Sequence, residues 1–220
     1  MHTWDYTTPE EEILRALDDM VRAGKILYIG ISDTPAWIIS RMNTIAELRG
    51  WTQFVGLQIK YSLIDRTVER ELLPMARKLD IAVTPRAVLG GGILSGKYNK
   101  KKDEEGRAKI YKSINNENLR IAGEVIKVAE ELGKTPSQLA LNWVRQQPGV
   151  MIPIIGAKTE KQLKDNLECL NFTLNEKHMN QLSEVSKIDM GFPHDFLTSE
   201  TIVDIIYGGT KDKIDNHHRF

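Results

Sequence analysis

The chain has 220 residues, of which 41% are hydrophobic and 27% are charged, enough for one substantial domain over residues 1–220. Its thirty basic and thirty acidic residues cancel, so no overall electrostatic attraction to nucleic acid is expected. No apolar run could span a bilayer, and the first residues lack the basic and apolar segments of a signal peptide. The single cysteine, Cys169, excludes a disulfide framework. We therefore expect a cytoplasmic α/β protein that binds neither membranes nor nucleic acid.

The first part of the chain alternates helix and strand signals. Thr8-Pro9-Glu10-Glu11 has the spacing of a capping box, which predicts the start of a helix. Short apolar, β-branched runs between the helices predict buried strands. The predicted order is a helix from Thr8 to Gly24, a strand over Lys25–Ile31, a helix from Thr34 to Gly50, a strand over Phe54–Ile59, a helix over Glu69–Leu79 and a strand over Ile81–Thr84.

Beyond residue 84 this alternation stops. The expected segments are a glycine-rich stretch at Leu89–Gly96, a charged and mobile loop at Lys100–Gly106, a helix over Asn118–Leu132, a capped helix from Thr135 to Pro148 and an irregular tail after Ser186. The glycine-rich stretch loosely resembles the G-x-G-x-x-G dinucleotide motif. However, no capped helix follows it directly and no acidic residue closes a second strand, so a Rossmann site is disfavoured.

The stretch from Val150 to Asn166 predicts an anion site. Val150–Ile155 is an apolar run typical of a buried strand, and Gly156-Ala157-Lys158 forms a turn that carries a cation. Thr159 and Gln162 then have the spacing that opens a helix. Free backbone N–H groups and the helix dipole favour an anion at such a turn. The alternative is an ordinary strand-to-helix connection with a surface lysine.

Strands separated by whole helices predict right-handed βαβ units and a parallel sheet. In such folds the carboxyl ends of the strands carry the functional site. Small and polar residues follow each predicted strand: Ser32 and Asp33, Gln58 and Tyr61, Thr84 to Arg86, and Gly156 to Lys158. We expect these residues to meet at one edge of the sheet.

Five ordered motifs resemble those of the aldo-keto reductases, in particular the bacterial and potassium-channel-β-like branch. They are His2-x-Trp4-Asp5, Tyr28-Ile29-Gly30-Ile31-Ser32, Leu57-Gln58-x-x-Tyr61-Ser62, Leu89-Gly90-x-Gly92-x-Leu94-x-Gly96-Lys97-Tyr98 and Ile155-Gly156-Ala157. The resemblance implies a TIM-type (β/α)8 barrel that uses NADPH without a Rossmann motif. It covers nearly the whole chain but begins in the middle of the family pattern, because His2 aligns with the end of the fourth strand. The fold implied is an N-terminally incomplete parallel barrel, about its second half.

The resemblance also implies roles for individual residues. His2 would orient the substrate carbonyl. The cofactor would be held at the nicotinamide by Ser32, Asp33 and Gln58, along the pyrophosphate by Leu89, Gly90 and Gly92, and around the adenosine and its phosphates by Gly156, Lys158, Gln162, Asp165 and Asn166. No metal ligand is implied. Simpler readings remain open: a frayed His2, Asp33 as a helix cap, Gln58 and Tyr61 as strand-end packing, and solvated Asp165 and Asn166.

Two positions depart from the family pattern. Asp33 stands where asparagine is usual, and an ionised carboxylate only accepts hydrogen bonds. Arg86 stands where an aromatic ring usually stacks on the nicotinamide, and a planar guanidinium can also stack. Our hypothesis is that this cation favours the neutral reduced ring over the positively charged oxidised ring.

The catalytic tyrosine, lysine and aspartate of the family pattern lie upstream of its histidine, and this chain has none of them. We expect four good strands and a stub at Met1–Trp4, with unpaired edges that favour self-association. Two functions remain open. One is NADPH-dependent reduction of a small aldehyde or ketone, weak or absent in this chain. The other is a non-catalytic nucleotide-binding or interaction module.

Overall fold

The computed structural model describes residues 1–100 and 105–215. Its centre is a three-stranded parallel sheet in the order β1-β2-β3, formed by β1 (Ile29–Ser32), β2 (Phe54–Lys60) and β3 (Ala82–Arg86). Ser32 is in register with Gln58, and Gln58 with Thr84, so the carboxyl ends of the strands share one edge. The predicted α/β class and parallel sheet are confirmed.

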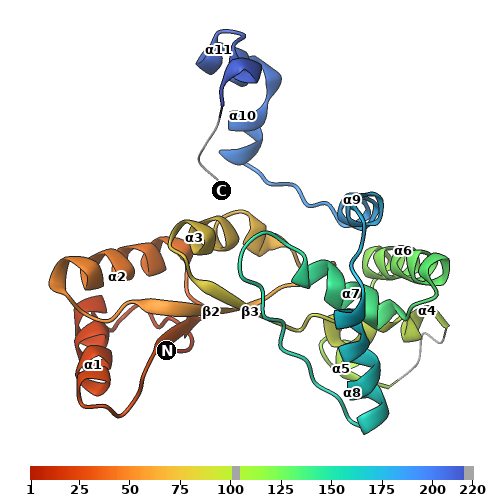
Figure 1. Ribbon diagram of the computed structural model, residues 1–220, viewed down its shortest axis with the longest axis horizontal. Helices are drawn as coiled ribbons and strands as arrows, with labels where there is room; N and C mark the ends of the chain where they lie inside the picture. The colour runs from red at the N-terminus through yellow and green to blue at the C-terminus, as the bar shows by residue number, and fades with distance from the viewer. Residues whose placement is uncertain (101–104, 216–220) are drawn as a thin grey trace.

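Helices flank this sheet, and α2 and α3 lie along one face of it (Figure 1). The α-helices are α1 (Glu10–Arg22), α2 (Ala36–Arg49), α3 (Leu72–Lys78), α4 (Lys97–Lys100), α5 (Arg107–Ile110), α6 (Asn116–Leu132), α7 (Pro136–Arg145), α8 (Glu160–Leu167), α9 (Glu176–Val185), α10 (His194–Thr198) and α11 (Glu200–Tyr207). Short 3-10 helices are η1 (Thr67–Glu69), η2 (Gly90–Ser95), η3 (Glu168–Asn171) and η4 (Lys211–Lys213). Leu14, Ile39, Met42 and Leu57 are fully buried in the core. No helix in the described ranges is long and apolar enough to cross a membrane.

The predicted strand at Val150–Ile155 is reduced to a single parallel bridge between Val83 and Met151. The chain nevertheless runs beside β3, because Val83 N donates to Val150 O, Ile152 N to Val83 O and Ile154 N to Pro85 O, each at 2.8 Å. The next bond of the ladder would need an N–H at position 85, which proline lacks. Pro85 therefore interrupts the pairing and prevents a regular fourth strand.

The predicted stub at the N-terminus is present. His2 forms a parallel bridge with Ser32, Thr3 N donates to Ser32 O, and Trp4 N donates to Asp33 O. These bonds hold residues 2–4 against the outer edge of β1. The backbone of His2 is therefore fixed, and its reading as a frayed residue is wrong.

Several predicted boundaries need correction. The strand expected from Lys25 begins only at Ile29, since Leu27 and Tyr28 are more than three-quarters exposed. Thr8 does not cap α1, whose N-cap is Pro9 without a side-chain bond. The helix expected from residue 69 to 79 begins at Leu72, because Pro74 can lie only in a first turn, where no N–H is required.

The C-terminal tail after Ser186, whose composition is irregular, contains helices. It carries α10 and α11, which stand away from the sheet in Figure 1. Arg70 donates to Asp189 O, and His194 Nε2 lies 3.1 Å from Glu71 Oε1, so the start of the tail contacts the region around η1. Of the predicted mobile loop at residues 100–106, residues 101–104 lie outside the described part of the chain. Lys100 ends α4 and Gly106 precedes α5.

Candidate functional site

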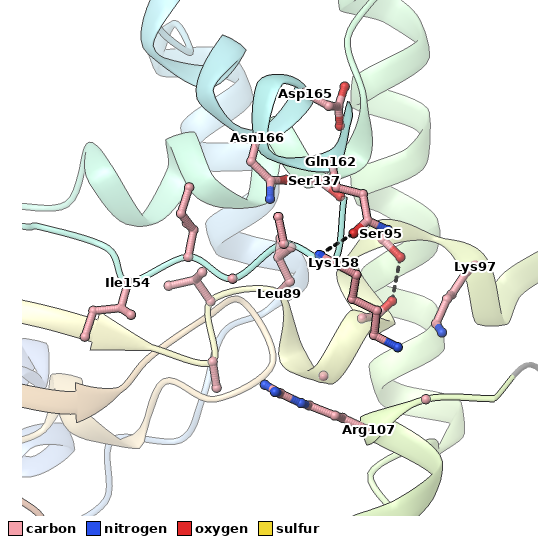
Figure 2. Close-up of a pocket in the computed structure, with 18 of the residues that line it drawn as sticks. Leu89, Ser95, Lys97, Arg107, Ser137, Ile154, Lys158, Gln162, Asp165 and Asn166 are labelled. Carbon is pink, nitrogen blue, oxygen red and sulfur yellow. Dashed lines mark hydrogen bonds between the residues drawn. The ribbon is translucent and has the colours of Figure 1, made fainter. Parts of the chain in front are cut away.

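A cavity of about 620 Å³ lies beside the end of β3 (Figure 2). Its wall comes from five parts of the chain: the end of β3, η2, the start of α5, the start of α7 and the segment from residue 154 through α8. The lining residues are Arg86, Ala87, Val88, Leu89, Gly91, Gly92, Ser95, Lys97, Gly106, Arg107, Ser137, Ile154, Ile155, Gly156, Ala157, Lys158, Gln162, Asp165 and Asn166. Eight of the twelve predicted cofactor residues therefore line the cavity, namely Arg86, Leu89, Gly92, Gly156, Lys158, Gln162, Asp165 and Asn166, whereas Ser32, Asp33, Gln58 and Gly90 do not.

The turn before α8 is held by its own side chains. The Thr159 hydroxyl accepts a bond from Gln162 N at 3.2 Å, which caps the helix as predicted. The Gln162 side chain accepts from Lys158 N at 2.8 Å instead of returning to Thr159, so the predicted capping box is only half formed. This pair of bonds fixes the turn and directs the Lys158 side chain toward the cavity (Figure 2).

Positive charge gathers around the cavity. Figure 2 shows the side chains of Lys97, Arg107 and Lys158 around the same space, and Arg86 also lines the wall. Lys97 Nζ donates to Glu105 O at 2.6 Å. Among the described residues of the lining, Asp165 is the single acidic one. Arg86 is paired with Asp33, so Lys97, Arg107 and Lys158 are the cations that make this cavity suited to an anionic ligand with several charges.

Sequence reasoning did not identify Lys97 and Arg107 as site residues. Lys97 belongs to the quoted Gly96-Lys97-Tyr98 motif, which offered a signal for it. Arg107 follows the charged segment at residues 100–106 and had no such signal. Ser95 and Ser137 also line the cavity and were not predicted. Ser95 Oγ donates to Gly92 O at 2.7 Å, which closes the η2 turn.

The glycines of η2 allow its tight path along the cavity. Gly90, Gly91 and Gly92 all have positive φ, at 56°, 67° and 99°. A Cβ on Gly90 would clash with the Ile64 side chain, and one on Gly91 would lie 3.0 Å from Ala108 N. Gly91 and Gly92 line the cavity, whereas Gly90 packs against Ile64 and does not.

Asp165 and Asn166 are not solvated side chains. The Asp165 carboxylate accepts from Thr135 Oγ1 at 3.1 Å and from Gln138 Nε2 at 2.8 Å. Thr135 and Gln138 form the predicted capping box of α7, which is confirmed. Asp165 therefore ties α8 to the start of α7, and Asn166 beside it is buried.

A second polar cluster lies at the ends of β1 and β3. His2 Nδ1 lies 3.0 Å from Ser32 Oγ and 3.7 Å from Asp33 Oδ2. Arg86 Nη2 donates to Asp33 Oδ1 at 3.0 Å. Asp33 does not cap α2, which begins after Pro35 without a side-chain cap. Gln58 is half-buried on β2, the strand between β1 and β3. It is in register with Ser32 on one side and with Thr84 on the other.

Tyr61 and Tyr98 are placed away from a role as general acid. The Tyr61 hydroxyl is buried and donates to Glu69 Oε1 at 2.7 Å. Burial, followed by the Glu69 carboxylate, raises the pKa of Tyr61 far above its usual range. A general acid of this type needs the opposite shift. Tyr98 is also fully buried, and its hydroxyl has no partner among the described residues.

Comparison with known proteins agrees with the motifs. Residues 1–187 match the aldo/keto reductase family. The chain is 34% identical over 209 residues to a putative aryl-alcohol dehydrogenase of Saccharomyces cerevisiae, covering 92% of this chain and 73% of that protein. A probable aryl-alcohol dehydrogenase of the same yeast is also 34% identical, with 92% and 64% covered. Norsolorinic acid reductase B of Dothistroma septosporum is 33% identical over 201 residues, with 90% and 51% covered.

The chain thus spans between about half and three-quarters of the length of these curated relatives. The family match covers most of the chain, and the resemblance inferred from the five motifs is confirmed. The described residues contain no group of three or more acidic, histidine or cysteine side chains that could hold a metal ion. This chain belongs to the aldo/keto reductase family.

Proposed function

We propose that this chain binds NADP(H) in the cavity beside β3 and is the cofactor-holding part of a carbonyl oxidoreductase. The observation that carries the proposal is the convergence of Lys97, Arg107 and Lys158 on one cavity that also contains a capped helix start. A dinucleotide with a 2′-phosphate is an elongated polyanion, and it matches this distribution of charge. The parallel sheet would then be part of a TIM-type barrel.

The cavity suggests one orientation for the dinucleotide. Its phosphates lie against Lys97, Arg107 and Lys158, and its adenosine lies near Gln162 and Asn166 at α8. The nicotinamide would be held at the strand ends, where Arg86 lines the cavity and contacts Asp33. Ser32, at the end of β1, and Gln58, its register partner on β2, would bind the carboxamide.

The bound cofactor would supply the hydride for an aldehyde or ketone substrate. The residues of this chain would bind and orient the reactants, and His2, whose Nδ1 lies 3.0 Å from Ser32 Oγ, would hydrogen-bond the carbonyl oxygen of the substrate. The acid that completes such chemistry is not provided by Tyr61, whose raised pKa keeps its proton bound. This observation favours weak turnover or the second candidate function, a nucleotide-binding module without catalysis.

Two measurements on the same preparation test the proposal. NADPH fluorescence should change saturably on titration with the protein, and NADPH consumption should be followed with a panel of aldehydes and ketones. Saturable binding with turnover supports a reductase, and saturable binding without turnover supports the binding module. An absence of saturable binding would contradict both.

A further inference from the structure

An ion pair joins the ends of the two outer strands of the sheet. Arg86 Nη2, at the end of β3, lies 3.0 Å from Asp33 Oδ1 and 3.3 Å from Asp33 Oδ2, directly after β1. The strand β2 lies between β1 and β3, and the pair crosses the sheet edge beyond Gln58, because Arg86 is in register with Lys60. Arg86 lines the cavity and Asp33 does not, so Arg86 connects the pair to the end of the cavity nearest the strands.

Stability alone gives a weak reason for this contact. The two side chains are 40% and 34% exposed, and an ion pair in such surroundings contributes little to folding. The backbone on each side is nevertheless held in an uncommon conformation, with φ of 47° at Asp33 and 57° at Ala87. Two sharp turns therefore present one negative and one positive side chain to each other at the cavity end.

The two charges act in opposite ways on a nicotinamide ring. The oxidised ring carries a positive charge and the reduced ring is neutral. A nearby carboxylate therefore favours the oxidised form, and a nearby guanidinium favours the reduced form. A closely paired carboxylate and guanidinium largely cancel each other.

We propose that the Asp33–Arg86 ion pair sets the preference of this site for the oxidised or reduced cofactor. The inference rests on the proposed NADP(H) site. Arg86 is held against Asp33, so the earlier hypothesis that Arg86 alone favours the reduced ring is replaced by a balance of two charges. Removing Asp33 leaves the Arg86 charge unbalanced and should favour the reduced cofactor. Removing Arg86 leaves the Asp33 charge unbalanced and should favour the oxidised cofactor.

The test is a four-membered cycle of variants: the unchanged protein, Asp33→Asn, Arg86→Gln and the double variant. For each, the dissociation constants of NADP⁺ and NADPH are measured by isothermal titration calorimetry at one pH. The ratio Kd(NADP⁺)/Kd(NADPH) should rise about threefold or more in Asp33→Asn and fall by a similar factor in Arg86→Gln. The double variant should return to within about twofold of the starting ratio. Asparagine tolerates the positive φ at position 33, so this substitution keeps the turn.

Two further variants serve as controls. Asp19→Asn removes a carboxylate from the exposed Arg15–Asp19 pair on α1, outside the cavity wall, and should leave the ratio unchanged. Lys158→Gln should weaken the binding of NADP⁺ and of NADPH by the same factor, because Lys158 would contact the phosphates that both forms share. Thermal denaturation establishes that each variant is folded. If one single variant does not fold, the other still tests the direction in which the ratio of dissociation constants changes.

The outcomes separate this inference from the function on which it rests. If the unchanged protein binds neither NADP⁺ nor NADPH, the proposed site itself is wrong. If it binds both, and the two single variants leave the ratio within twofold or move it in the same direction, the inference about Asp33 and Arg86 is overturned.

Discussion

At the scale of single residues, Asp165 connects the cofactor cavity to the rest of the fold. Its carboxylate accepts bonds from Thr135 and Gln138, and Gln138 is itself buried. Replacing Asp165 with alanine removes the acceptor of the Thr135 hydroxyl and one of the two acceptors of Gln138 Nε2, which keeps its bond to the backbone oxygen of residue 165. We expect the free energy of unfolding to fall by about 1–2 kcal/mol.

Urea denaturation of Asp165→Ala measures this loss. Glu160→Ala is the matched control, because Glu160 lies on the same helix in an exposed pair with Lys164 and should change stability little. Asp165→Ala should also weaken NADPH binding, since the orientation of α8 depends on the contact. Equal stability of the two variants would show that Asp165 does not tie α8 to α7.

The cavity shows which site residues a sequence can reveal. Gly156, Lys158 and Gln162 follow one another in a strand–turn–helix pattern, so local spacing was enough to predict them. Arg86 and Asp33 are 53 positions apart, and their contact depends on the register of β1, β2 and β3. Such a contact follows only from the folded sheet.

At the scale of elements, Asp18 on α1 joins the first helix to the segment before β2. Its carboxylate accepts from Thr52 N and Thr52 Oγ1 at 2.9 Å and from Arg22 Nε. The Arg22 bond, followed by the Thr52 bonds, lowers the pKa of Asp18. A lowered folded pKa means that stability from this group is fully present above the unfolded pKa of about 3.9 and is lost as pH falls through the folded value.

Asp18→Asn should therefore be less stable than the unchanged protein at neutral pH, with the difference shrinking as the pH falls below about 4. Chemical denaturation at a series of pH values measures both curves. The Asp19→Asn variant provides the comparison, because Asp19 pairs with Arg15 on the exposed side of the same helix. A difference between Asp18→Asn and the unchanged protein that does not depend on pH would contradict this role for the carboxylate.

The segment Val150–Ile154 shows how an element can be placed correctly and still differ in form. Its apolar, β-branched composition predicted a strand beside the sheet, and three backbone bonds to β3 are present. The hydrophobic pattern of a segment does not show which residues of the neighbouring strand can donate a backbone hydrogen bond. Here Pro85 of β3 has no N–H to donate. Hydrogen exchange should find the amides of Val83, Ile152 and Ile154 protected. Exchange of Ile152 and Ile154 at the rate of an unfolded peptide would contradict this pairing.

At the scale of the whole molecule, the open sheet leaves apolar surface uncovered. Val150, Ile152 and Ile154 are 55%, 54% and 44% exposed beside β3, and on the opposite edge the short segment of residues 1–4 pairs with β1. We expect the chain to self-associate through these edges, with a mass in sedimentation velocity that rises with concentration. Ile152→Lys should reduce the association, and Leu48→Lys, at an exposed position on α2, should not. A monomer throughout the accessible concentration range would refute this expectation.

The central claim is that the cations of the cavity hold the phosphates of NADP(H). The most direct measurement compares the dissociation constants of NADPH and NADH for the unchanged protein, Lys158→Gln and the control Lys164→Gln, whose lysine pairs with Glu160 outside the cavity. We expect NADPH to bind about tenfold more tightly than NADH, and we expect Lys158→Gln but not Lys164→Gln to weaken the binding of NADPH. Equal responses of the two lysine variants, or no saturable binding of NADPH, would contradict this claim.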